Sequence, residues 1–293
     1  MKIAVAGKGG VGKTAIAAWF GDHLAREGRN VFLIDADTAL SLGRASGLSP
    51  ALLPRPLIER EDLVTERVGA GLMALCPEVG DLPERLAVEL PLGGQLAIFP
   101  GPADPDQAGA GRVGLGRKRL LVMGGTASAG GGCACAANAL LKALLAHLVL
   151  DRHEWVIVDL EAGVEHLGRG TVAGVDGLVV VSEPSLRGLE TAASIARMAR
   201  ELGLARQALV LNRADAGVHP PVLPELADLP PLAASLPCLD SLAQRQLVDG
   251  SVLGLPEAGG AIAQACRRIL DALRSSSAIQ MKDAWRPEVR DRR

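Results

Sequence analysis

The chain has 293 residues, of which 48% are hydrophobic and 22% charged, and its formal net charge is −2. This composition is typical of a globular protein with enough apolar material for one large α/β domain or two small ones. Charges of both signs are spread along the sequence, so we expect neither a nucleic acid nor a membrane surface as a partner. The sequence has no apolar stretch near the roughly 18 residues of a spanning helix and no secretory signal at its start, which predicts a cytoplasmic protein.

Short apolar runs bounded by glycine, proline or aspartate predict strands. They lie at residues 3–7, 31–37, 95–101, 119–125, 155–163, 177–184 and 208–213. Helical periodicity predicts helices over residues 14–28, 137–154 and 189–203. Because the runs are apolar throughout and alternate with helices, we expect an α/β fold with a mostly parallel, twisted sheet and helices on both faces.

The predicted helices and strands belong to a single domain over residues 1–275. Residues 43–118 are rich in proline and glycine, and we interpret them as an elaboration of this domain with a mobile loop at 101–118. Residues 276–293 are polar and interrupted by proline, which predicts a frayed C-terminal tail or an extension that docks elsewhere.

The first predicted strand runs into GKGGVGKT at residues 7–14, which matches the P-loop pattern G-x-x-x-x-G-K-[ST] between a strand and a helix. Glycines let backbone N–H groups turn toward an anion, and the helix N-terminus adds partial positive charge. Lys13 is suited to neutralise the β- and γ-phosphates, and Thr14 to offer its hydroxyl to Mg²⁺. The predicted nucleotide-binding residues of the loop are Gly9, Gly10, Val11, Gly12, Lys13, Thr14 and Ala15.

Aspartates end two further predicted strands, at the sheet edge where the phosphates are expected. Asp35 and Asp37 lie in LIDAD, and Asp159 lies in VIVDLEAG. We expect Asp35 and Asp159 to join Thr14 at the magnesium ion. The segment that follows Asp159 has the D-x-x-x-G pattern of a loop that senses the γ-phosphate.

Asn212 ends the strand predicted at 208–213, where its amide can hydrogen-bond a purine. Residues 212–215 read NRAD, which differs from the guanine-binding pattern N-K-x-D only at Arg213. Asn212 and Arg213 are therefore candidate base-binding residues, and both ATP and GTP stay open on this pattern alone.

Cys133 and Cys135 form a C-x-C pair directly before a predicted helix. Thiolates near a helix N-terminus ionise more easily and are good soft metal ligands. One chain supplies only two ligands, whereas a dimer with its two-fold axis near this turn would supply four. The alternative is a pair of buried cysteines that act as small apolar side chains.

Lys8 gives the loop the sequence KGGVGKT, which resembles the deviant Walker motif of the nitrogenase iron protein and of the division and partition ATPases. The resemblance implies that Lys8 reaches across a nucleotide-dependent homodimer to the partner's phosphates and that the nucleotide is ATP. It also implies a hydrolytic role for Asp37, so that Lys8, Lys13 and Asp37 form the catalytic set. The segment from Pro237 to Asp240 is similar to the loop that closes over adenine in this family.

Within that family, GGGCACAANALL, DLEAGVEHLGRG and EDLVTERVG together resemble the accessory ATPases that insert nickel into carbon monoxide dehydrogenase. The resemblance implies that Cys133 and Cys135 bind Ni²⁺, or Zn²⁺, at the dimer interface and that nickel passes to a client such as carbon monoxide dehydrogenase. Ala136 and Thr38 stand where proline is usual in these ATPases, and a different metalloenzyme stays open as the client. The switch II residues implied to couple nucleotide to metal are Glu161, Gly163, Glu165 and His166.

Two other functions stay open. An iron–sulfur ATP-dependent reductase of the nitrogenase iron protein kind would have a cysteine shortly after Asp159, where EAGVEHLG has none. A positioning ATPase of the division or partition type that binds a membrane would end in an amphipathic basic helix, and residues 276–293 do not have this pattern.

Overall fold

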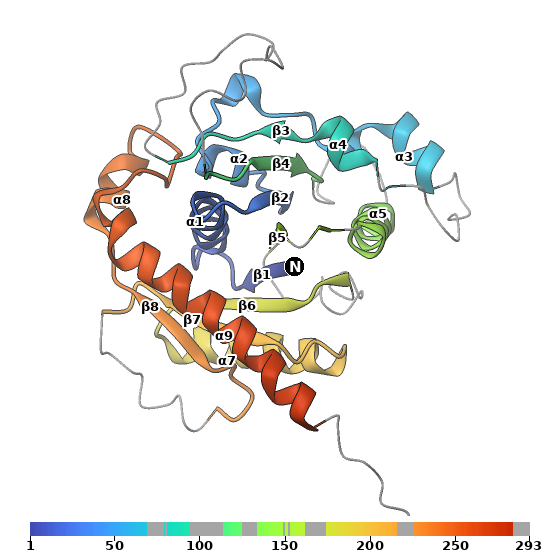
Figure 1. The fold of residues 1–293 in the computed structure, drawn as a ribbon. Coiled ribbons are helices and arrows are strands. Elements are labelled where there is room, and N and C mark those ends of the chain that lie inside the picture. Colours follow the sequence, from blue (N-terminus) through green and yellow to red (C-terminus); the bar gives the residue numbers. More distant parts are fainter. Residues whose placement is uncertain are drawn as a thin grey trace, which may run out of the picture.

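The structure is a computed structural model of the chain. It describes residues 1–68, 79, 81–93, 114–124, 134–148, 150–151, 153–161, 174–215 and 226–283. Its strands form one sheet in the order β3-β4-β2-β5-β1-β6-β7-β8 (Figure 1). The strands are β1 (Lys2–Gly7), β2 (Asn30–Ala36), β3 (Val88–Glu89), β4 (Lys118–Val122), β5 (Glu154–Leu160), β6 (Gly177–Ser182), β7 (Gln207–Asn212) and β8 (Leu232–Leu236). Every neighbouring pair is parallel except β3 and β4, so the predicted mostly parallel sheet is confirmed.

Helices cover both faces of this sheet. The described helices are α1 (Lys13–Arg26), α2 (Leu42–Ala45), α3 (Glu61–Val68), α4 (Leu82–Leu86), α5 (Ala134–His147), α7 (Leu186–Glu201), α8 (Asp240–Gln246) and α9 (Ala261–Asp283), with 3₁₀ turns η1 (Pro50–Leu52), η2 (Leu57–Glu59) and η5 (Pro256–Gly259). One core packs α1 and α9 against the sheet, and the other packs α5 and α7 against the opposite face (Figure 1). Alternate residues of β1, such as Ile3 and Ala4, enter different cores, which explains why this strand is apolar at every position from Ile3 to Ala6.

Most elements predicted from the sequence are present within the described residues. The predicted strands at 3–7, 31–37, 119–125, 155–163, 177–184 and 208–213 correspond to β1, β2, β4, β5, β6 and β7. The strand predicted at 95–101 lies outside the described residues, as does most of the predicted loop at 101–118. Strand β8 was missed because LAASL has no β-branched residue, and its hydrogen bonds to β7 place it at the sheet edge.

One helix was predicted too long. The helix predicted over 137–154 ends at His147, and Glu154 already belongs to β5. Glu154 pairs with Asn30 of β2, so this residue belongs to the sheet although the helical pattern extends to it. Helix α9 runs past residue 275, where the tail was predicted to start, and ends at Asp283. Within the described part of the chain, no helix combines the length and the apolar character needed to cross a membrane.

A buried ion pair connects helix α1 to strand β4, near one edge of the sheet. The Nζ atom of Lys118 on β4 lies 2.8 Å from Oδ1 of Asp22 on α1, and the lysine side chain is fully buried. Asp22 also accepts hydrogen bonds from the backbone N–H of Gly93 and from Nε of Arg26, each at 2.8 Å. These donors hold the pKa of Asp22 below its usual value against the opposing effect of burial. The helix that begins at the P-loop is thereby connected to β4 and to the backbone at Gly93.

Candidate nucleotide site

The P-loop connects the end of β1 to the start of α1. Gly10 and Gly12 have φ values of 81° and 95°, a left-handed conformation that glycine adopts far more readily than other residues. Gly12 is the N-cap of α1 and offers no side-chain cap, so the first N–H groups of the helix are free to bind an anion. Gly7 lies so close to β6 that an added Cβ would stand 2.2 Å from the carbonyl oxygen of Val181. The glycines of this loop are therefore required by its backbone path.

The two lysines of the loop have different environments. Lys13, in the first turn of α1, is only 6% exposed. Lys8 is exposed, as are Gly9 and Gly10 beside it. Lys13 therefore belongs to the interior of the site, whereas Lys8 lies on the surface of the loop.

Asp35 and Asp159 lie side by side at the carboxyl ends of β2 and β5, where they are paired in register. Both are fully buried. Burial raises the pKa of Asp159 to about 7, while the nearby Thr14 hydroxyl and Lys13 act in the opposite direction. Burial also raises the pKa of Asp35 to about 6, opposed by N–H groups of Leu42 and Asp37 at 2.9 and 3.3 Å. The sheet thus places together the two carboxylates that the sequence predicted at one edge.

The chemistry of this pair fits a magnesium ion. Neither carboxylate oxygen of Asp159 has a hydrogen-bond partner within 3.5 Å among the described residues, although both are buried. A buried carboxylate without donors is costly unless a cation compensates its charge. Mg²⁺ prefers carboxylate and hydroxyl oxygens and retains several waters. Asp159 and Thr14 therefore fit as its ligands, and Asp35, whose oxygens accept backbone N–H groups, fits as a ligand through water.

The segment after β2 connects the phosphate loop with the end of β5. Asp37 is partly exposed, and its Oδ1 accepts a hydrogen bond from the N–H of Ala39 at 2.9 Å. Thr38 donates through Oγ1 to Oε1 of Glu161 at 2.9 Å, and Ser41 Oγ lies 3.4 Å from Thr14 Oγ1. Sequence reasoning missed the contributions of Thr38 and Ser41. The signal for them was two isolated hydroxyl residues, Thr38 and Ser41, shortly after the strand-end Asp37.

Asn212 contacts the P-loop directly. Its Nδ2 donates to the carbonyl oxygen of Val11 at 2.8 Å, across 201 residues of sequence. Asn212 pairs with Leu236 at the end of β8, so Pro237 follows at the same edge of the sheet. Asp240, at the start of α8, is exposed.

Arg213 makes a different contact. It has a φ of 57°, and its guanidinium forms an ion pair with Glu183. The structure therefore brings Asn212 and the segment from Pro237 to the P-loop edge, and their roles toward the base stay predictions.

Several predicted residues lie outside the described part of the chain. They are Cys133, the side chain of Cys135, Gly163, Glu165 and His166. Helix α5 begins at Ala134, directly after the first cysteine. In its last turn, the carbonyl oxygen of Leu145 accepts a hydrogen bond from Nζ of Lys2, at the start of β1. The C-terminal end of α5 therefore lies at the edge where β1 begins, and its first turn is directed toward the opposite, phosphate-binding edge. Among the described side chains, no group of three or more His, Cys, Asp and Glu is arranged to hold a metal ion, and the C-x-C pair stays a prediction.

A glycine loop, a buried lysine and two strand-end carboxylates at one edge of a parallel sheet define a P-loop nucleotide-binding protein. Comparison with known families makes this class more specific. Residues 2–250 match the family described as the CobQ/CobB/MinD/ParA nucleotide binding domain, and the chain belongs to this family.

Individual relatives agree with this assignment. The chain is 38% identical to the carbon monoxide dehydrogenase accessory protein CooC of Rhodospirillum rubrum over 244 residues, which cover 81% of this chain and 83% of that protein. It is 35% identical to an uncharacterized ATP-binding protein of Methanocaldococcus jannaschii, with 73% and 75% of the two chains covered. The fold is similar to that of the MinD cell division protein of Aquifex aeolicus, with a TM-score of 0.61, 18% identity and coverage of 92% and 96%. The resemblance to carbon monoxide dehydrogenase accessory ATPases is confirmed.

Proposed function

We propose that this protein is an ATP-dependent metallochaperone. It forms a homodimer around nucleotide, binds nickel at paired C-x-C turns and delivers the metal to an enzyme such as carbon monoxide dehydrogenase. The observation that carries the proposal is the 38% identity, over most of both chains, to a carbon monoxide dehydrogenase accessory protein. The nickel ion is the cargo, and ATP provides the switch between the states that hold and release it.

The residues of the nucleotide site have separate roles in ATP hydrolysis. The amides of the P-loop bind the phosphates, and the buried Lys13 neutralises their charge. Asp159 and Thr14 would hold Mg²⁺, which would supply positive charge to the phosphates. Asp37, partly exposed at the same edge, accepts a hydrogen bond from the attacking water and so orients it.

The exposure of Lys8 supports the dimer. A lysine on the surface of the phosphate loop is available to a second molecule that approaches the same edge. The direction of α5 supports a metal site near that approach, because the helix starts toward the edge where the P-loop lies. Cys133 and Cys135 of two chains together supply the four thiolates that a closed tetrahedral site requires.

Anaerobic titration with Ni²⁺ and Zn²⁺, with and without MgATP, tests the proposal. We expect about one ion per two chains, thiolate charge-transfer absorbance, and a dimer mass in native mass spectrometry that ATP favours. Cys133→Ala/Cys135→Ala should lose the ion, and Cys238→Ala, which removes an exposed cysteine elsewhere, should keep it. Metal binding that survives the double substitution rejects the site, and the visible absorption of an iron–sulfur cluster after anaerobic purification replaces the chaperone with a reductase.

A further inference from the structure

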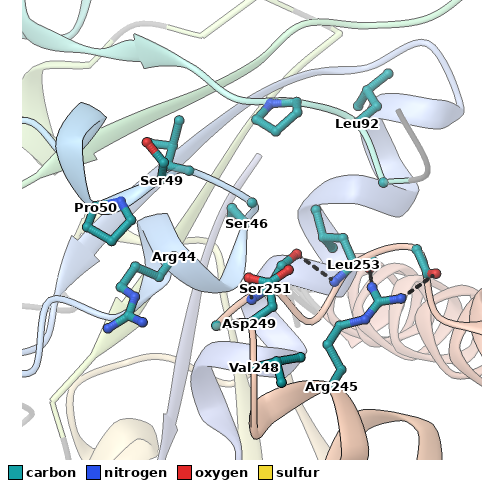
Figure 2. A pocket seen from close by; sticks show the side chains of 16 residues that line it. Arg44, Ser46, Ser49, Pro50, Leu92, Arg245, Val248, Asp249, Ser251 and Leu253 are labelled. Atoms are coloured by element: carbon teal, nitrogen blue, oxygen red, sulfur yellow. Dashed lines mark hydrogen bonds between the residues drawn. The ribbon is translucent and has the colours of Figure 1, made fainter. Parts of the chain in front are cut away.

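A hollow of about 770 Å³ opens between α2 and the segment that follows α8 (Figure 2). Its walls come from three parts of the chain, at residues 44–50, 91–93 and 245–254. Its volume lies within the range of about 300 to 1,000 Å³ that is usual for ligand sites. None of the described residues that line it belongs to the nucleotide site or to the proposed nickel site.

Part of the wall of the hollow is apolar, and it continues into an exposed apolar rim. Leu48, Leu92 and Leu253 line it and are themselves buried. At its edge, Val248 is 89% exposed, and the preceding Leu247 is 85% exposed. Two adjacent aliphatic side chains this exposed beside a hollow are typical of a surface that another protein covers. A small molecule inside the hollow would leave this rim uncovered, whereas a protein partner can cover both.

Charge in the hollow favours an anion. The guanidinium of Arg44 lies over Gly250, and no carboxylate of the described residues lies within ion-pair distance of it. Arg245, the second cation of the lining, donates to the carbonyl oxygens of Leu253 and Gly254. The carboxylate of the lining, Asp249, accepts the N–H of Ser251 at 3.0 Å.

One buried hydroxyl in the wall of the hollow has no partner among the described residues. Ser46 lines the hollow and is fully buried, and its Oγ makes no hydrogen bond with the described part of the chain. Buried hydroxyls are normally paired, because an unpaired one costs free energy. Because this Oγ has almost no accessible surface, an occupant of the hollow does not reach it. Arg44 is therefore the group that points to an occupant that is polar as well as apolar.

We propose that this hollow binds a peptide segment of a partner protein in which an acidic residue is flanked by aliphatic residues. The acidic side chain pairs with Arg44. The aliphatic side chains pack on the buried leucines and on Leu247 and Val248. This site is separate from the nickel site and does not depend on Cys133 or Cys135.

The walls of the hollow are attached to both helices that leave the nucleotide site. The N–H of Val252 donates to the carbonyl oxygen of Ala45 at 3.0 Å, at the end of α2. Nε1 of Trp19, on α1, donates to the carbonyl oxygen of Val252 at 2.7 Å. At the other end of α2, the N–H of Leu42 donates to Asp35. A partner in the hollow therefore rests on a frame that is continuous with the phosphate site.

Selection from a phage-displayed library of short random peptides tests the proposal on the full-length protein without nucleotide or added metal. We expect enrichment of peptides with Asp or Glu between Leu, Ile, Val or Phe. Arg44→Glu should weaken binding of the selected peptides by about 10-fold or more and shift selection toward basic peptides. Arg55→Glu is the matched control, since Arg55 is 65% exposed in the same region, lies outside the hollow and should leave binding unchanged.

Val248→Asp provides a second test on the apolar rim. It should weaken the same peptides, while an unchanged circular-dichroism melting curve shows that this exposed position has not disturbed folding. The absence of acidic peptides from the selection, or equal binding by the Arg44→Glu variant, overturns the proposal. A nucleotide-free wild-type dimer that Val248→Asp dissociates, seen by sedimentation velocity, overturns it as well, because the occupant is then a second copy of this chain.

Discussion

Replacing Gly12 by alanine should destabilise the nucleotide-free protein by about 1.5 to 3.5 kcal/mol. Gly12 has a φ of 95°, and an L side chain in this left-handed region costs about 1 to 2 kcal/mol. The added Cβ would stand 2.4 Å from Nδ2 of Asn212. The amide must then move away and lose its 2.8 Å hydrogen bond to Val11, which costs a further 0.5 to 1.5 kcal/mol, roughly.

Gly10→Ala is the matched control. Gly10 has a φ of 81°, but an added Cβ there meets no atom within 4 Å. It therefore carries the conformational cost of the left-handed region without the collision. Since 1 kcal/mol shifts the melting temperature of a domain of this size by about 2 to 4 °C, Gly12→Ala should melt clearly below Gly10→Ala.

Asn212→Ala separates the collision from the backbone strain. Alone, it should cost about 1 kcal/mol through the lost hydrogen bond, and in the Gly12→Ala background it should cost almost nothing. Thermal melting of the four proteins without nucleotide gives this coupling directly. Equal melting of Gly12→Ala and Gly10→Ala, or simple additivity of the Gly12 and Asn212 substitutions, would refute the reasoning.

Further predictions concern the charged residues of the site. The folded pKa of Asp159, near 7, exceeds its unfolded value of about 3.9, so the native state binds more protons between these values and stability falls as pH rises. Metal-free, nucleotide-free protein should therefore melt lower at pH 8 than at about pH 5, and Asp159→Asn should flatten this profile; an equally steep profile in the variant contradicts the assignment. Lys13→Ala should lower MgATP affinity and turnover by about 100-fold or more. Lys8→Ala should stay monomeric and bind nucleotide with unchanged affinity. A fluorescent ATP analogue measures affinity and a phosphate-release assay measures turnover, and full activity of Lys13→Ala rejects the P-loop assignment.

The parts of the site that the sequence predicted are those that depend on local order. The P-loop needs a strand, a glycine turn and a helix in immediate succession, and the chain has all three within residues 2–26. Asp35 and Asp159 were predicted at one edge because parallel strands end on the same side of a sheet, whatever lies between them.

The parts that the sequence did not predict depend on contacts between distant segments. The hydrogen bond from Asn212 to Val11 needs β7 to end beside the P-loop, which no pattern within either segment specifies. Glu154 continues a helical pattern and yet joins β5, because pairing with β2 outweighs local propensity. The hollow beside Arg44 combines three separate segments, so no single stretch of sequence predicts it.

Val252 lies between α1 and α2 and is hydrogen-bonded, directly or through Trp19, to each. Any change in α2 between nucleotide states therefore reaches the wall of the hollow. Binding equilibria coupled in this way are reciprocal, so a partner that prefers one nucleotide state alters nucleotide affinity by the same factor. A protein docked in the hollow would then act as a nucleotide-exchange or nucleotide-retention factor without touching the nucleotide, and its departure would reset the cycle.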